Sequence, residues 1–167
     1  MGRVLVTGGV RSGKSAHAEG LLADRPAVTY VATGAVPGRD DSEWAARVAA
    51  HRARRPPGWT TLESTDLGSA LGATGAFLVD CLGTWLTAQL DDLGWEDEGL
   101  EVRVDALVTA VARCSDLVVV TNEVGAGVVP EHRSGRLFRD HLGLLNQRVA
   151  AVCDEVHLVV AGRVLVL

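Results

Sequence analysis

Short apolar runs rich in β-branched residues alternate along this chain with longer stretches whose apolar positions repeat every three or four residues. Five of these runs predict strands: Val4–Val6, Val28–Val31, Phe77–Val79, Leu117–Val120 and Val156–Val160. Each run is almost continuously apolar, which is typical of parallel strands that are buried on both faces. The alternation therefore predicts an α/β fold with three layers, in which helices cover both faces of a mostly parallel sheet.

The C-terminal residues follow a different pattern. The pair Ala161-Gly162 suits a tight turn, and the apolar residues after it predict an antiparallel edge strand that completes a C-terminal hairpin. A weaker strand pattern covers Trp59–Glu63. Apolar residues at three- and four-residue steps predict one amphipathic helix that packs on the core: Phe138, Leu142, Leu145, Val149 and Val152.

Composition narrows the class of protein. The chain has 167 residues, 47% of them hydrophobic, and we expect one catalytic domain over residues 1–167. No apolar run approaches the roughly 20 residues of a membrane span, and no signal segment precedes the first strand, so we expect a cytoplasmic protein without a membrane partner. The net charge of −5 argues against nucleic acid as a partner. Cys81, Cys114 and Cys153 are odd in number and widely spaced, which indicates buried free thiols.

The most informative motif follows the first predicted strand directly. Residues 8–15 match G-x-x-x-x-G-K-[ST], in which backbone N–H groups surround phosphates, the lysine reaches the β- and γ-oxygens, and the hydroxyl holds Mg²⁺. Lys14 is therefore a candidate catalytic cation and Ser15 a candidate metal ligand, and an ordinary glycine turn is the alternative. The candidate triphosphate-binding residues are Gly8, Gly9, Val10, Arg11, Ser12, Gly13, Lys14 and Ser15.

Asp80 follows the strand Phe77–Val79, where P-loop proteins carry the acid that completes a Mg²⁺ site. We expect it to be a second metal ligand, and a compatible alternative is that it caps the helix beginning after Cys81. A regulatory GTPase would also carry an N-K-x-D motif that reads guanine. The nearest segment, Thr121–Val124, lacks both the lysine and the aspartate, which argues against a nucleotide-dependent switch.

A second candidate constellation is a helical segment that ends at Pro56 and carries Arg47, His51 and Arg55 four residues apart. One helix face would hold a histidine between two arginines, which suits a polyphosphate. The two cations disfavour the imidazolium form, and the neutral imidazole is a usable nucleophile near pH 7. A solvated basic helix explains the same spacing.

Residues 121–123 follow the strand Leu117–Val120 and lead into a glycine-containing loop. Because ligands collect at the carboxyl ends of parallel strands, we expect these side chains near the site, and a purely structural turn fits the composition equally well. Three arginines further along either reach an anion or form a solvated helix face: Arg133, Arg136 and Arg139.

Together these segments resemble the bifunctional adenosylcobinamide kinase / adenosylcobinamide-phosphate guanylyltransferase family of cobalamin biosynthesis. The P-loop alone is typical of a superfamily, whereas T-N-E-V-G-x-G followed by V-P, F-R-D and N-Q is far more specific. The resemblance covers essentially the whole chain and implies a P-loop NTPase-type fold. It also implies a propeller-like homotrimer with sites between the subunits, which composition does not test.

The resemblance implies two reactions on a corrinoid substrate. The family phosphorylates the aminopropanol hydroxyl of adenosylcobinamide with ATP or GTP, then transfers GMP from GTP to the new phosphate, giving adenosylcobinamide-GDP and pyrophosphate. The second step runs through a covalent GMP-histidine, which matches His51, and Mg²⁺ is the expected cofactor. The remaining residues that match nucleotide-contacting stretches of the family are Ala32, Thr33, Gly34, Arg52, Ala53, Arg54, Arg55, Glu63 and Asp80.

Two positions depart from the family's pattern. Ala50 precedes a lone His51 where some members carry adjacent histidines, and Asp80 stands where some carry glutamate. The shorter acid can still serve Mg²⁺ directly or through water. The alternative functions are a simple P-loop kinase of small molecules without guanylyl transfer and a non-catalytic nucleotide-dependent switch.

Overall fold

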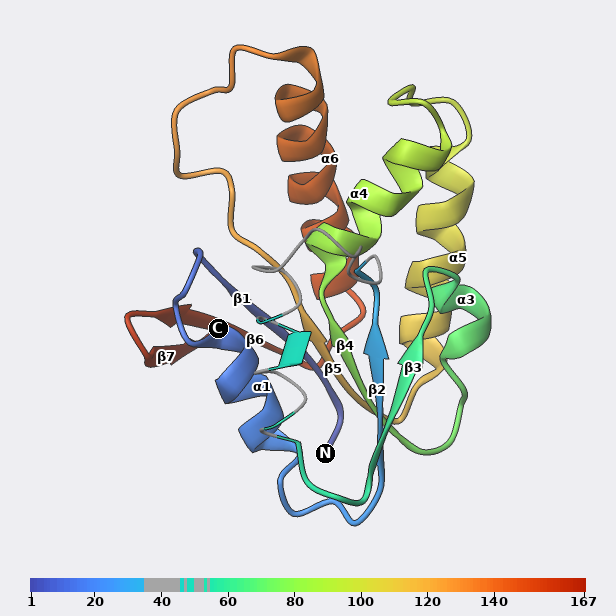
Figure 1. The fold of residues 1–167 in the computed structure, drawn as a ribbon, viewed down its shortest axis with the longest axis vertical. Coiled ribbons are helices and arrows are strands. Elements are labelled where there is room, and N and C mark those ends of the chain that lie inside the picture. The colour runs from blue at the N-terminus through green and yellow to red at the C-terminus, as the bar shows by residue number, and fades with distance from the viewer. Residues whose placement is uncertain (35–45, 47, 50–52, 54) are drawn as a thin grey trace.

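A single seven-stranded sheet organises the computed structural model, which describes residues 1–34, 46, 48, 49, 53 and 55–167 (Figure 1). The strand order is β3-β2-β4-β5-β1-β6-β7, and β7 runs antiparallel to β6 while the other neighbouring pairs are parallel. The strands are β1 (Arg3–Gly8), β2 (Val28–Ala32), β3 (Trp59–Glu63), β4 (Ala76–Asp80), β5 (Asp116–Val120), β6 (Glu155–Val160) and β7 (Arg163–Val166). The predicted mostly parallel sheet with an antiparallel edge strand is confirmed.

Helices cover the two faces of this sheet unequally. α1 packs on one face and α3, α4, α5 and α6 on the other, as the two hydrophobic clusters of the core show. The described helices are α1 (Lys14–Leu21), α3 (Leu67–Ala70), α4 (Leu82–Asp92), α5 (Leu100–Arg113) and α6 (Arg133–Ala150). The predicted three-layer arrangement is therefore confirmed in the described part of the chain.

Burial on both faces explains why the strands are continuously apolar. In β1, Leu5 joins the cluster under α3–α6, whereas its neighbours Val4 and Val6 join the cluster under α1. All three side chains are buried. Each predicted strand is present and extends by one or a few residues beyond its apolar run, and the weaker pattern at Trp59–Glu63 is also a strand.

The C-terminal hairpin contacts the loop that follows β1. β6 and β7 are joined by Ala161 and Gly162, both with positive φ, as the predicted tight turn requires. The Gly162 N–H donates to the carbonyl oxygen of Ser12 at 2.9 Å. The end of the chain therefore braces the candidate phosphate-binding loop.

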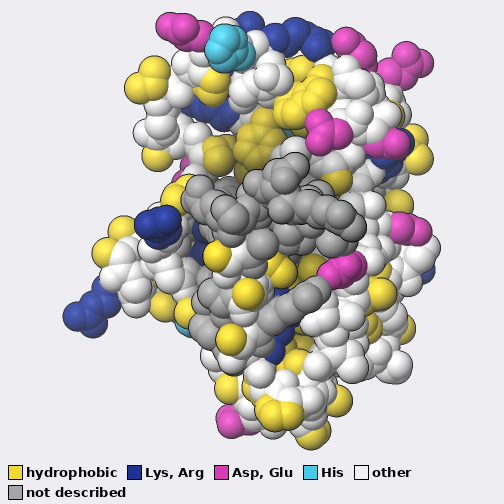
Figure 2. Space-filling view, viewed as in Figure 1, with side chains coloured by type: hydrophobic (Ala, Val, Ile, Leu, Met, Phe, Trp, Pro, Cys, Tyr) yellow, Lys and Arg dark blue, Asp and Glu magenta, His cyan; other side chains and the backbone are white. Residues whose placement is uncertain are grey.

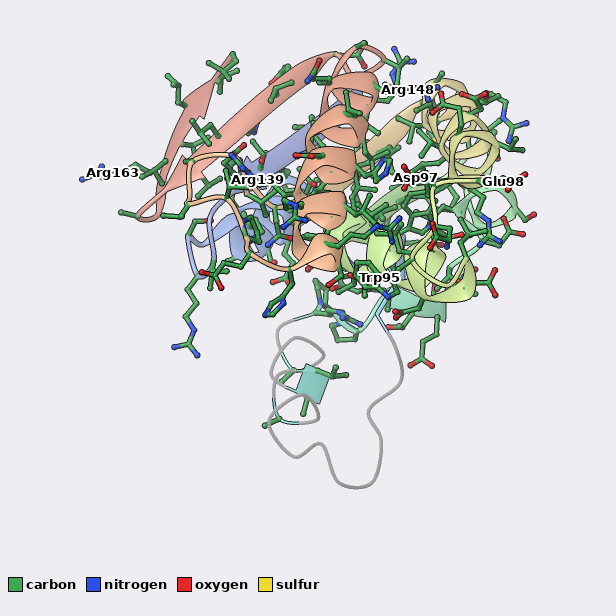
Figure 3. All side chains as sticks on the ribbon, turned by 90° about the horizontal axis from the view of Figure 1, so that it is seen from above. Trp95, Asp97, Glu98, Arg139, Arg148 and Arg163 are labelled. Carbon is green, nitrogen blue, oxygen red and sulfur yellow. The ribbon has the colours of Figure 1, made fainter. Side chains whose placement is uncertain are left out.

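α6 confirms the predicted amphipathic helix and starts earlier than its apolar stripe. Leu142, Leu145 and Val149 are the buried residues of this helix, whereas Val152, the last residue of the predicted stripe, lies beyond its end at Ala150. On its outer side Arg148 pairs with Glu101 and Asp105 of α5 (Figure 3). The three spaced arginines bind protein groups: Arg133 pairs with Glu96, Arg136 donates to the carbonyl groups of Pro130 and Glu131, and Arg139 donates to that of Gly125. The structure thus gives these arginines a structural role.

Two further expectations concern the class of protein. No helix among the described residues is long and apolar enough to cross a membrane. All three cysteines are free thiols, with Cys114 buried and Cys81 and Cys153 partly buried. Burial raises the pKa of Cys153 to about 12, so this thiol stays protonated at neutral pH.

A pH-dependent ion pair anchors the start of β1. Asp154 accepts hydrogen bonds from the Arg3 backbone N–H at 2.7 Å and from Arg3 Nη2 at 2.8 Å, and these bonds lower the pKa of Asp154 to about 2 from its usual 3.8. Since the folded-state pKa is the lower one, the carboxylate stabilises the fold above its usual pKa, and this contribution is lost as the pH falls toward 2.

We therefore expect Asp154→Asn to be less stable than the unchanged protein at pH 7, with a difference that shrinks between pH 4 and pH 2. Urea unfolding at pH 7, 5, 4 and 3 measures this. Asp24→Asn is the control, because Asp24 makes no ion pair with any described residue. An equal loss for Asp154→Asn at all four pH values would contradict the assignment.

Candidate functional site

The candidate phosphate-binding loop joins β1 to α1 at the carboxyl edge of the sheet. Gly8 ends β1, Gly13 caps α1 with φ of 97°, and Lys14 is the first helical residue. Arg11 also has positive φ, at 55°. The loop therefore turns sharply and directs the N-terminus of α1 toward its own interior, which favours anions.

Close packing explains the first glycine of the motif. A Cβ atom on Gly8 would collide with the carbonyl oxygen of Val159 in β6 and would meet Ser12 Oγ at 2.7 Å. Gly9 differs, because its Cβ would meet no atom of the described residues within 4 Å. Gly8 is thus required for packing on β6, whereas Gly9 borders open space.

Two polar side chains lie inside the loop. Lys14 is 8% exposed, and its Nζ donates to the Gly9 carbonyl oxygen at 3.1 Å. Ser12 Oγ is buried and has no hydrogen-bond partner among the described residues. A buried hydroxyl without a partner costs free energy, and an oxygen of a bound phosphate would satisfy it. The loop therefore fits the triphosphate that its sequence predicts.

β5 lies between the phosphate-binding strand β1 and the Asp80 strand β4. Val120 of β5 is level with both Val6 and Asp80. After β5 the chain runs on beside the end of β1. The Thr121 N–H donates to the Val6 carbonyl oxygen at 2.9 Å, and the Glu123 N–H donates to the Gly8 carbonyl oxygen at 3.1 Å. Residues 121–123 thus lie next to the start of the loop, as the strand-end argument predicted.

Three residues predicted to bind the nucleotide, Ala32, Glu63 and Asp80, are level with one another at the carboxyl edge of the sheet. β2 lies between β3 and β4, and Ala32 pairs with Glu63 on one side and with Asp80 on the other. Thr33 follows Ala32 and is fully buried. The structure therefore brings the predicted residues of β2, β3 and β4 together.

Cys81, and not Asp80, caps α4. Cys81 is the N-cap residue and forms a capping box with Thr84, while Asp80 is the last residue of β4. Thr33 Oγ1 donates to the Cys81 carbonyl oxygen at 2.7 Å and accepts from the Cys81 N–H at 3.1 Å. The alternative role of Asp80 as a helix cap is therefore wrong, because the helix starts one residue too late for it.

The predicted metal ligands are oxygen donors on two elements: the Ser15 hydroxyl on α1 and the Asp80 carboxylate on β4. Mg²⁺ prefers oxygen ligands and is often held by one or two carboxylates together with substrate phosphates. No cluster of three His, Cys, Asp or Glu side chains suited to a metal exists in the part of the chain that the structure describes. The donor set thus fits Mg²⁺ bound with a nucleotide better than a metal held by protein alone.

Two site neighbours escaped the sequence analysis. Tyr30 in β2 donates its hydroxyl to Asp80 Oδ2 at 3.0 Å. Asn146 of α6 accepts from Thr121 Oγ1 at 2.6 Å and donates to the Asn122 carbonyl oxygen at 3.1 Å. The N-Q pair of the resemblance contained Asn146, but its partners depend on the packing of α6 on the sheet.

The histidine segment is described only in part. His51, Arg52 and Arg54 lie outside the described residues, as does Arg47. Ala53 is helical and exposed. Arg55 stacks on Tyr30, with its guanidinium carbon 3.3 Å from the ring centroid.

A histidine pair fastens α1 to β6. His17 Nε2 and His157 Nδ1 are 2.8 Å apart, and His157 Nε2 is 2.9 Å from Glu155 Oε2. Burial and the neighbouring His157 lower the pKa of His17, which favours the neutral ring. The pair thus holds the helix that begins inside the phosphate loop.

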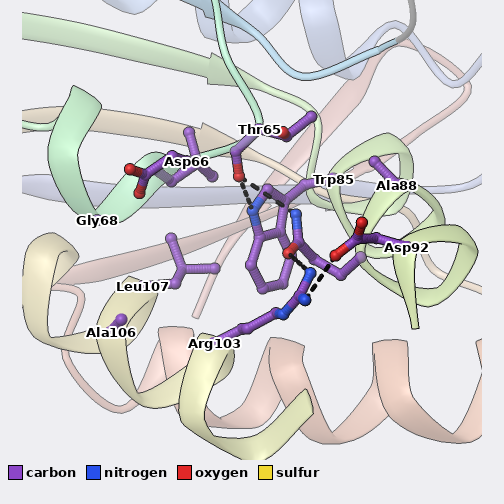
Figure 4. A pocket seen from close by; sticks show the side chains of 11 residues that line it. Thr65, Asp66, Gly68, Trp85, Ala88, Asp92, Arg103, Ala106 and Leu107 are labelled. Atoms are coloured by element: carbon purple, nitrogen blue, oxygen red, sulfur yellow. Dashed lines mark hydrogen bonds and ion pairs between the residues drawn. The ribbon is translucent and has the colours of Figure 1, made fainter. Parts of the chain in front are cut away.

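A separate hollow of about 490 Å³ lies between α3, α4 and α5 (Figure 4). Arg103 pairs with Asp92 at 2.6 Å and donates to Gln89 Oε1 at 2.9 Å, while the Trp85 indole donates to the Thr65 carbonyl oxygen at 2.8 Å. None of the predicted nucleotide-binding residues lines this hollow. It is therefore distinct from the candidate site.

Charged side chains also gather at the end of the molecule where α4 ends and α6 begins, at the top of Figure 2. Arg133 pairs with Glu96 at 3.0 Å, and His141 Nε2 lies 3.3 Å from Asp97 Oδ1. Basic and acidic side chains therefore lie side by side at this end.

Comparison with known proteins gives concordant matches over nearly the whole chain. A family model described as cobinamide kinase / cobinamide phosphate guanyltransferase matches residues 4–167. The bifunctional adenosylcobalamin biosynthesis protein CobU of Salmonella typhimurium is 44% identical over 176 residues, covering 95% of this chain and 96% of that protein. The bifunctional adenosylcobalamin biosynthesis protein CobP of Pseudomonas aeruginosa is 41% identical over 168 residues, covering 96% and 94%.

Among solved structures, a prototypical ATPase from the type III secretion system of pathogenic bacteria aligns with a TM-score of 0.57 at 12% identity. The alignment covers 94% of this chain and 51% of that one, so this chain spans about half of its length. This likeness concerns the fold alone, and it confirms the P-loop NTPase-type architecture.

The two adjacent glycines of the loop give a matched pair of variants. Gly8→Ala should lower the free energy of unfolding by about 2 kcal/mol, because the added methyl group collides with the backbone of β6. Gly9→Ala should change it by no more than about 0.5 kcal/mol, because its methyl group meets open space. Urea unfolding of both variants measures the difference, and equal losses would show that the loop packs differently.

Proposed function

Since this chain belongs to the cobinamide kinase / cobinamide phosphate guanyltransferase family, we propose that the site at the carboxyl edge of its sheet serves both activities. The chain is an enzyme of cobalamin biosynthesis with kinase and nucleotidyltransferase activity. The family match over residues 4–167 carries this conclusion, and the intact phosphate-binding loop supports it.

In the kinase reaction the aminopropanol hydroxyl of adenosylcobinamide attacks the γ-phosphorus of ATP or GTP. The bond to the β-phosphate oxygen breaks, the nucleoside diphosphate leaves, and the hydroxyl proton passes to solvent. The loop of residues 8–15 binds the triphosphate, and Lys14 offsets its charge from a buried position. Positioning and electrostatic stabilisation supply most of the catalysis in reactions of this class.

In the guanylyl reaction His51 attacks the α-phosphorus of GTP, and pyrophosphate leaves. A phosphate oxygen of adenosylcobinamide-phosphate then attacks the same phosphorus and releases the histidine, giving adenosylcobinamide-GDP. The covalent intermediate divides one displacement into two. Support for His51 comes from its place in the sequence, four residues before Arg55. Arg55 stacks on Tyr30, and the Tyr30 hydroxyl donates to Asp80.

Mg²⁺ is the proposed cofactor, with Ser15 and Asp80 as the protein groups that would hold it. When bound with a nucleotide, it would neutralise phosphate charge. Further nucleotide contacts are proposed for residues 32–34, residues 52–55 and Glu63. Ala32, Glu63 and Asp80 support this by being level at the sheet edge.

The corrinoid is the proposed partner, with no role for nucleic acid or a membrane. A cytoplasmic homotrimer with sites between subunits stays a proposal that depends on the resemblance. Its simplest test is the molar mass of the protein in solution by light scattering.

The GMP-histidine is tested by incubation with Mg²⁺ and GTP labelled at the α-phosphate, followed by denaturation and peptide mapping. We expect an acid-labile, alkali-stable label on His51. His51→Ala should lose the label and lower guanylyl transfer by about a hundredfold or more, while the kinase rate changes by less than about threefold. Labelling elsewhere, or full guanylyl transfer by His51→Ala, would favour a kinase that transfers GMP without His51.

Lys14→Ala should lower the kinase rate by about a hundredfold or more, because a buried cation that faces the phosphates is lost. Steady-state phosphorylation of adenosylcobinamide measures this. Arg163→Ala is the matched control, because Arg163 projects from β7 into solvent (Figure 3). Comparable losses in both variants would point to net charge and not to position.

A further inference from the structure

We propose that Tyr30 is a positioning residue that fastens both Asp80 and Arg55, and so joins the metal-binding edge of the site to the segment that carries His51. The inference rests on the proposed function and extends it to a residue outside the phosphate-binding loop. Two contacts carry it: the Tyr30 hydroxyl meets the Asp80 carboxylate, and the Tyr30 ring meets the Arg55 guanidinium.

The hydroxyl of Tyr30 reaches along the sheet toward the strand end. Tyr30 is level with Leu78, and Ala32 with Asp80, so the phenol spans two residues of strand to reach the carboxylate of Asp80 at 3.0 Å. Tyr30 is 3% exposed and packs in the core cluster under α1. A side chain fixed by packing along its length holds its terminal hydroxyl in one place, which is what orienting a carboxylate requires.

The Tyr30 hydroxyl is the donor of this hydrogen bond, and the Asp80 carboxylate is its acceptor. Hydrogen-bond partners of metal-binding carboxylates orient them, and their loss commonly weakens metal affinity by about 10- to 100-fold.

The ring of Tyr30 holds the second group. The Arg55 guanidinium lies over the ring face at 3.3 Å from its centroid, and Arg55 Nη1 donates to Thr61 Oγ1 on β3 at 2.7 Å. Stacking on a buried aromatic face favours a cation, and the planar guanidinium suits it better than an ammonium group does. Arg55 is thus held between β2 and β3, close to the strand edge where Ala32, Glu63 and Asp80 are level.

The position of Arg55 in the sequence gives this contact its functional meaning. Arg55 follows His51 by four residues, and Pro56 comes next. Holding Arg55 therefore fixes the end of the segment that carries the nucleophile. The same phenol orients the Asp80 carboxylate, which would face the nucleotide's metal ion. One side chain therefore sets the position of this carboxylate relative to the end of the segment that carries His51.

Three variants separate the two contacts. Tyr30→Phe removes the hydroxyl and keeps the ring, Arg55→Met removes the guanidinium and keeps the hydroxyl, and Tyr30→Leu removes both. Thr60→Val is the control, because it deletes a hydroxyl from an exposed position of β3. Thermal melting of each full-length variant verifies that it folds.

Two readouts are used. Binding of Mn²⁺ in the presence of β,γ-imido GTP, followed by the electron paramagnetic resonance of free Mn²⁺, reports on Asp80. The rate of GMP labelling on His51 reports on the Arg55 segment. Tyr30→Phe should weaken Mn²⁺ binding about tenfold and, at saturating Mg²⁺, change labelling by less than about twofold. Arg55→Met should slow labelling about tenfold and, at saturating β,γ-imido GTP, leave Mn²⁺ binding within about twofold. Tyr30→Leu should both slow labelling and weaken Mn²⁺ binding.

Unchanged Mn²⁺ binding in folded Tyr30→Phe would overturn the proposal, and so would unchanged labelling in Tyr30→Leu. Failure of the proposed function looks different, because the unchanged protein would then take no label on His51. In that case the Mn²⁺ titration still tests the Asp80 contact. The Arg55 contact is then read from the Kd for β,γ-imido GTP, which Arg55→Met and Tyr30→Leu should raise to the same extent, and an unchanged Kd in both would overturn it.

Discussion

The register of β5 against its two neighbours is the constraint on which the site depends. Val120 is level with Val6 on one side and with Asp80 on the other, so the phosphate-binding loop and the acid are held one strand apart. A slip of one residue would exchange the two faces of a strand. Because both faces are packed with apolar side chains, the core itself prevents that slip.

Hydrogen bonds of buried polar side chains hold the carboxyl ends of the strands in place, in addition to the backbone pairing. Thr33 and Thr121 are fully buried, and each is satisfied by a partner on another element: Thr33 by Cys81 and Thr121 by Asn146. Satisfied buried networks of this kind rigidify a site, whereas a partly satisfied one would be costly. These contacts fix the strand ends, while Ser12 Oγ in the loop has no hydrogen-bond partner among the described residues and suits a ligand.

The sequence was sufficient to predict the features that depend on local pattern. Continuous apolar runs predicted the strands, and the spacing of glycines, lysine and serine predicted the phosphate-binding loop. Asp80 was singled out because it directly follows an apolar run. The order of the strands was not predictable, because it follows from which faces pack together across the whole chain. Tyr30 illustrates the same limit: an aromatic residue in a buried strand is typical of core packing, and only the strand neighbours show that its hydroxyl meets Asp80. The roles of His51, Arg52 and Arg54 stay predictions.

The hydrogen bond from Gly162 to Ser12 joins two segments that lie far apart in the sequence. The ribosome makes the phosphate-binding loop well before it makes the hairpin that braces the loop. A nascent chain therefore carries a complete nucleotide-binding motif without the strand that Gly8 packs against. In this architecture the loop is braced only after β6 and β7 have been made, so a chain that stops before them has no braced loop with which to compete for nucleotide.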